Sequence, residues 1–76
     1  MKVEIIIGRI TSVTDESIRV EFTNVQGFLE EKEYQRADNG PVFNESFRKR
    51  YLNRDNLRIC LGDGKVTRVD ALSPRQ

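Results

Sequence analysis

A chain of 76 residues with one cysteine and no histidine cannot form an intramolecular disulfide, and it lacks the side chain that zinc sites and general bases use most often. Its 13 basic and 12 acidic side chains leave a net charge of +1, which excludes the strongly basic class of DNA-coating proteins. We expect one small domain over residues 1–76. Its stability should be marginal, so a homodimer or another partner would increase it.

The first 23 residues predict a β-hairpin with a polar turn at residues 14–17. In the second strand, apolar residues alternate with polar ones at Ile18, Val20 and Phe22. This alternation is the pattern of a strand that buries one face.

The first strand of this hairpin changes the parity of its apolar residues at Gly8. Val3, Ile5 and Ile7 share one parity, whereas Ile10 lies on the other. A glycine at such a change indicates a bend or a bulge. A long first strand that bends at a glycine is typical of small barrels, in which one strand serves both sheets.

The last third of the chain predicts a second hairpin. Apolar residues alternate from Leu57 to Leu61, and Gly62–Gly64 supplies a tight turn. Val66 and Val69 in the following strand are three residues apart, so we expect a bulge there. The two hairpins should lie side by side in one antiparallel sheet or barrel. Their inward side chains are predicted to be Ile5, Ile7, Ile18, Val20, Phe22, Leu57, Ile59 and Leu61.

The middle of the chain allows two interpretations. Residues 28–37 are rich in helix formers, and the stop signal Asn39–Pro41 follows them. The same residues can instead form a third strand that turns at residues 38–40, because Asn-Gly pairs favour hairpins. Next, Asn44 can cap a short helix over residues 45–53.

These elements predict a β-rich α+β fold, a small antiparallel barrel or curved sheet with one or two short helices in the middle. If residues 28–36 form a strand, the order is the β-β-β-α-β-β order of an oligonucleotide/oligosaccharide-binding (OB) barrel. If they form a helix, the result is a four-stranded antiparallel sheet with helices on one face. The bend expected at Gly8 favours the barrel.

The composition argues against an enzyme. Without histidine, a Ser–His or Cys–His pair cannot form, and Cys60 lies in a predicted strand, where we expect it to be an inert packing residue. Glu30, Glu31, Glu33 and Asp38 follow no known metal-ligand spacing, and we interpret them as a solvated acidic face. We therefore expect no catalytic residue, no metal and no cofactor.

One constellation of residues favours binding. Residues 1–46 carry a net charge of −4 and residues 47–76 a net charge of +5, and the densest basic cluster overlaps the last aromatic residues. Aromatic faces and cations together suit single-stranded nucleic acid, with stacking for bases and positive charge for phosphates. The predicted binding residues are Phe43, Arg48, Lys49, Arg50, Tyr51, Arg54 and Arg58.

Two functions follow from this cluster. The first is a non-enzymatic module that binds single-stranded nucleic acid or RNA. The second is a compact inhibitor or adaptor, of the kind that phages and mobile elements encode, which docks on an acidic protein surface or mimics nucleic acid with its own acidic face. The chain shows no apolar run of membrane-spanning length and no signal-peptide pattern, so we expect a cytoplasmic protein without a membrane partner.

Overall fold

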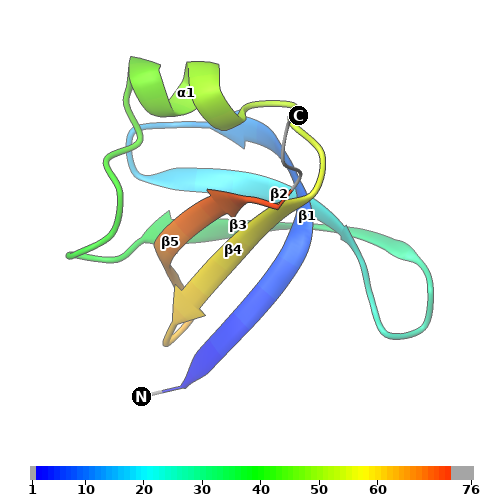
Figure 1. Ribbon diagram of the computed structural model, residues 1–76. Helices are drawn as coiled ribbons and strands as arrows, with labels where there is room; N and C mark the ends of the chain where they lie inside the picture. Colours follow the sequence, from blue (N-terminus) through cyan, green and yellow to red (C-terminus); the bar gives the residue numbers. More distant parts are fainter. Residues whose placement is uncertain (1, 73–76) are drawn as a thin grey trace.

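The computed structural model describes residues 2–72, and these residues form five strands and one helix (Figure 1). Residues 29–36 form a strand, so the interpretation with two helices is wrong. The elements follow one another as β1 (Val3–Val13), β2 (Ser17–Thr23), β3 (Leu29–Arg36), α1 (Glu45–Tyr51), β4 (Leu57–Gly62) and β5 (Lys65–Ala71).

The five strands hydrogen-bond in a closed ring in the order β1-β2-β3-β5-β4. β1 pairs with β4, which brings the two terminal hairpins side by side, as the sequence predicted. The expected antiparallel pairing holds everywhere except between β3 and β5, which are parallel and meet only at Gln35↔Lys65 and Arg36↔Val66. The pairing of β4 with β5 shifts at Cys60/Leu61, which confirms the bulge expected in the last strand.

The core fills the inside of this ring. The side chains that are no more than 1% exposed come from four of the strands and are Ile10, Ile18, Val20, Leu57, Ile59, Leu61 and Val66. Alternation in β2 and β4 therefore predicted the buried face correctly, and Phe22 is half-buried against this core.

The prediction for the first half of β1 is wrong. Ile5 and Ile7 are 59% and 46% exposed, whereas Ile6 is half-buried and Ile10 is fully buried. The inward parity is thus the same before and after Gly8. With three isoleucines in succession, apolar character alone cannot tell which parity faces inward.

Gly8 marks the point where β1 exchanges one neighbour for the other. It pairs with Phe22 of β2 and with Leu57 of β4, and the register shift lies further on, between Ile10 and Ser12. A Cβ atom at position 8 would clash with the carbonyl oxygen of Glu21. The glycine is therefore required because a neighbouring backbone approaches it closely, rather than because a bulge sits at this residue.

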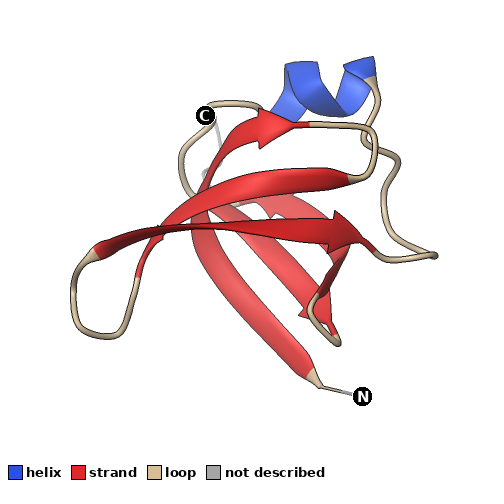
Figure 2. Cartoon of the chain, turned by 180° about the vertical axis from the view of Figure 1, so that it is seen from behind, coloured by secondary structure: helices blue, strands red, loops and turns tan. Residues whose placement is uncertain are grey.

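The helix α1 lies across one end of the ring, at the top of Figure 1 and of the reverse view in Figure 2. Asn44 caps it as predicted, since its side-chain oxygen accepts a hydrogen bond from the backbone N–H of Phe47 at 3.0 Å. Phe47 is buried in the core. β2 and β3 extend together beyond the side of the ring as a projecting arm, at the right of Figure 1 and the left of Figure 2.

Candidate functional site

The structure divides the predicted basic–aromatic cluster into two places. Arg48, Lys49 and Arg50 lie on α1, and Arg54 lies in the loop that follows it. Arg58 lies on β4, part of the ring itself. The cations of the cluster therefore do not form one continuous surface.

The aromatic members of the cluster belong to the interior. Phe43 is 2% exposed and packs against Phe47, with ring centroids 4.8 Å apart, so the prediction that Phe43 stacks on a base is wrong. Tyr51 is half-buried, its ring lies 5.0 Å from that of Phe47, and its hydroxyl donates to the carbonyl oxygen of Val69 at 3.3 Å. These three aromatic side chains hold α1 against the strands, because aromatic pairs at such separations stabilise packing.

Arg48 has a structural partner as well. Its Nη2 atom donates to the carbonyl oxygen of Val13 at 3.1 Å, at the end of β1. This bond fixes the position of α1 over the ring. Substitution of Arg48 would therefore change both the charge of the helix and its attachment.

Arg58 faces the outside of the sheet and is paired there with a carboxylate that it shares with Arg68. Its Nη2 atom lies 3.4 Å from a carboxylate oxygen of Asp70, which also pairs with Arg68 at 3.0 Å. Arg58 thus contributes to the pairing of β4 with β5 and does not join the cations of α1.

Three cations of the cluster carry no such partner. Lys49, Arg50 and Arg54 are exposed, and within residues 2–72 none of them forms an ion pair or a side-chain hydrogen bond. We define them as the α1 basic face. Glu45 at the start of the helix and Asp55 after it are the nearest acidic residues along the chain, so a local excess of positive charge remains.

Of the predicted acidic face, Glu31 and Glu33 lie with Glu21 on an outer face of β2 and β3, and this face is largely neutralised. Glu30 lies on the opposite parity of β3, and Asp38 lies in the loop that follows β3. Arg19 pairs with Glu31 at 3.2 Å and with Glu33 at 3.8 Å, and Arg9 pairs with Glu21 at 3.1 Å. The prediction of a solvated acidic face did not anticipate these partners, because the sequence gives no cross-strand register for Arg19.

Hydrogen bonding also affects the acidity of this face. The Thr11 hydroxyl donates to Glu31 at 2.6 Å, and this bond, together with the hydrogen bond and charge of Arg19, lowers the pKa of the Glu31 carboxyl from its usual value. On the inner side of β3, burial raises the pKa of Tyr34, and the charges of Glu4 and Glu30 raise it further.

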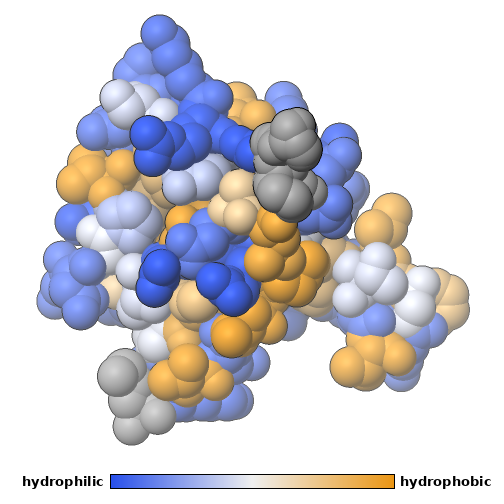
Figure 3. Space-filling view, viewed as in Figure 1, coloured by the Kyte–Doolittle hydropathy of each residue, from blue (hydrophilic) through white to orange (hydrophobic). Residues whose placement is uncertain are grey.

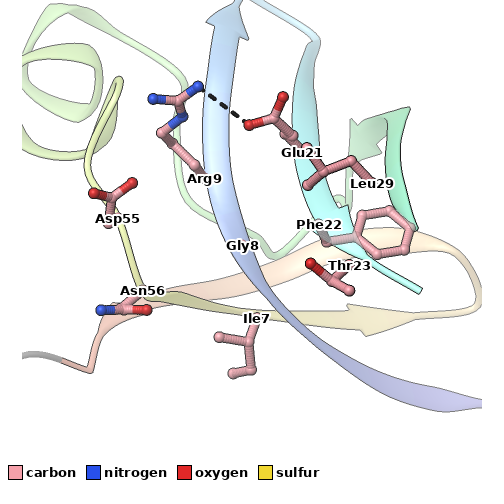
Figure 4. A pocket seen from close by; sticks show the side chains of 9 residues that line it. All are labelled: Ile7, Gly8, Arg9, Glu21, Phe22, Thr23, Leu29, Asp55 and Asn56. Carbon is pink, nitrogen blue, oxygen red and sulfur yellow. Dashed lines mark hydrogen bonds and ion pairs between the residues drawn. The ribbon is translucent and has the colours of Figure 1, made fainter. Parts of the chain in front are cut away.

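A hollow of the surface lies where β1 passes Gly8 (Figure 4). It has a volume of about 710 Å³ and runs between Ile7, Leu29 and Asn56, with the Arg9–Glu21 ion pair on its rim. Within the described residues, no three cysteine or carboxylate side chains are placed to hold a metal ion.

No protein-family model matches the chain, and no curated protein or solved structure is significantly similar to it. Across residues 2–72, none of the helical structure is long and apolar enough to span a membrane.

Proposed function

We propose that this chain is a non-enzymatic binding module with an OB-type barrel, and that its α1 basic face binds the phosphate backbone of a nucleic acid. The element order, with one helix between the third and fourth strands and a ring in the order β1-β2-β3-β5-β4, supports the OB assignment.

The choice of a nucleic acid as partner rests on which cations lack a carboxylate partner. Arg9, Arg19, Arg58 and Arg68 on the sheet are each paired with a carboxylate, and Arg36 donates to the carbonyl oxygens of Gly40 and Pro41. The cations of the α1 basic face have no such partner within residues 2–72. Unpaired cations that lie close together along the chain attract phosphate groups and release counterions when they bind them. The paired cations of the sheet would first have to lose their carboxylate partners.

The proposed mode differs from the usual one of OB barrels, in which the β2–β3 face contacts the ligand. Here the cations of that face are already paired with Glu21, Glu31 and Glu33, so the face offers no free positive charge to phosphates. Because Phe43 and Tyr51 pack inward, base stacking contributes little beside α1. We therefore infer backbone binding that depends weakly on base sequence.

Charge reversal tests the proposal. Fluorescence anisotropy with labelled single-stranded DNA and RNA should show binding at low salt, weakened at least tenfold by Arg50→Glu and abolished when Lys49→Glu and Arg54→Glu are added. With three phosphate contacts, the log–log salt dependence on a single strand should have a slope of about −2. Arg48 is left unchanged because it bonds to Val13.

Lys65→Glu is the matched control, because it makes the same change in net charge at an exposed residue on β5. It should weaken binding much less than Arg50→Glu does. Equal losses for the two variants, or no binding by the wild type at low salt, would refute the α1 basic face as a phosphate site.

Docking on a protein is the second candidate function. It is supported by the apolar side chains that the ring leaves exposed on β1, where Val3 and Ile5 are 66% and 59% exposed. Such contiguous apolar side chains are typical of protein-binding surfaces.

A further inference from the structure

The first half of β1 has a free backbone edge. Residues 3–8 pair with β4 on one side, but pairing with β2 on the other side begins only at Gly8. Within the described residues, no strand pairs with the second edge of Val3–Ile7. Figures 1 and 2 show this part of β1 diverging from the β2–β3 arm.

The free edge carries apolar side chains that are open to solvent. Val3, Ile5 and Ile7 share the outer parity and are 66%, 59% and 46% exposed. Figure 3 shows apolar surface along this half of β1 and on the arm, while the surface over α1 is hydrophilic. Natural edge strands usually carry charges that prevent pairing. Within Val3–Ile7 the charge is Glu4 on the inner parity, and the outer parity carries none before Arg9.

Space for another strand lies beside this edge. A groove of about 500 Å³ runs between Ile5 and Ile7 of β1 and the arm. Its opposite wall contains Phe22 on β2 and Val25 in the loop at the tip of the arm, together with the charged Glu30 and Lys32. The hollow at Gly8 continues from it along Ile7 and Leu29. An added strand would therefore gain backbone hydrogen bonds from β1 and apolar contacts from the arm.

We propose that this edge binds a second copy of the chain, with the two β1 strands antiparallel about a two-fold axis at Ile5. An antiparallel strand pair is self-complementary, so a single edge supplies both sides of the interface. This register places Ile5 opposite Ile5 of the other copy and Val3 opposite Ile7. Cross-strand pairs of β-branched residues stabilise such contacts.

Charge and area are compatible with this assembly. The net charge of +1 gives little repulsion between copies, and the α1 basic face lies at the far end of the ring from the edge (Figure 1). A stable interface buries about 800 Å² per partner, a modest share of the 5176 Å² surface of this chain. The proposal is independent of nucleic-acid binding.

The test is the oligomeric state of the full chain, measured by sedimentation velocity over a range of concentrations. We expect the wild type to be a dimer, and Ile5→Lys and Ile7→Lys to shift it to monomer. Val42→Lys is the matched control, because Val42 is also 59% exposed but lies outside the edge. It should remain dimeric, with far-UV circular dichroism confirming that all variants fold.

Several outcomes would overturn the proposal. A wild type that stays monomeric at millimolar concentration refutes it, and so does a dimer that survives both edge substitutions or is lost in Val42→Lys. Open-ended assemblies also refute it, because a two-fold contact closes at two copies. In the wild type, amide exchange at residues 3–7 should slow with rising concentration while α1 is unaffected, and the absence of this change would count against the edge.

Discussion

The two halves of β1 contain similar residues in opposite surroundings. Gly8–Val13 pairs with β2 and buries Ile10 and Val13, whereas Val3–Ile7 pairs with β4 alone and exposes Ile5. The same residue type is thus fully buried in one half and more than half exposed in the other. Burial along a strand therefore depends on which neighbouring elements curve over it as well as on alternation.

The largest expected effect comes from truncating one isoleucine in each half. Ile10→Ala should lower the free energy of unfolding by about 2–5 kcal/mol, because it leaves a cavity in the core. Ile5→Ala should change it by no more than about 0.5 kcal/mol in the monomer, because the side chain is already exposed. Urea denaturation at low protein concentration measures both, and similar losses would show that the two halves are equally buried.

The boundary between the halves can be tested at Gly8. Gly8→Val should destabilise the fold by about 1–3 kcal/mol or more, because its side chain meets the backbone of Glu21 and forces the strands apart. Thr11→Val, in the paired half, loses only a solvent-exposed hydrogen bond to Glu31 and should destabilise the fold much less. Thermal melts of the two variants compare them, and equal melting temperatures would remove the special role of Gly8.

The smallest effect concerns pH in the paired half of β1. The folded protein lowers the pKa of Glu31, so this group favours folding above its unfolded pKa, and that contribution is lost as the pH falls through the folded pKa. Thr11→Val should raise the pKa of Glu31 toward its usual value, because the strongest hydrogen bond to the carboxylate is removed.

NMR titration of the Glu31 carboxyl would measure this shift. Thr23→Val is a suitable control. Thr23 is also a threonine of the first hairpin, at the end of β2, but it is not among the groups that lower this pKa. An unchanged titration curve in Thr11→Val would contradict the assigned cause.

The sequence predicted the elements better than their surroundings. Alternation in β2 and β4 identified Ile18, Val20 and Ile59 as buried because each of these strands has polar residues on the opposite parity. In β1 the consecutive isoleucines place apolar residues on both parities, so the contrast between an apolar and a polar parity is lost. For residues 29–36 the helix formers were ambiguous, since Glu and Lys also suit a strand whose outer side chains pair with Arg19.

The candidate site was predicted only in part. The exposed positions of Lys49 and Arg50 follow from a short capped helix that directs its aromatic residues inward, and Arg54 lies in the polar loop after it. Burial of Phe43 and the pairing of Arg58 depend on contacts with residues distant in the sequence, among them Asp70. Such contacts form only when the strands close into the ring, so they cannot be predicted from local composition.

The parallel junction of β3 and β5 has fewer register pairs than the other strand pairs of the ring and is therefore its weakest point. It is held by two register pairs and by the hydrogen bond from the N–H of Ala37 to the carbonyl oxygen of Val66 at 3.0 Å, with Gly40 close against the same oxygen. Opening there would convert the ring into a continuous antiparallel sheet without breaking any other strand pair. Thermal fluctuations should therefore concentrate at this junction. The ring would open and close between β3 and β5 while its other strand pairs stay formed.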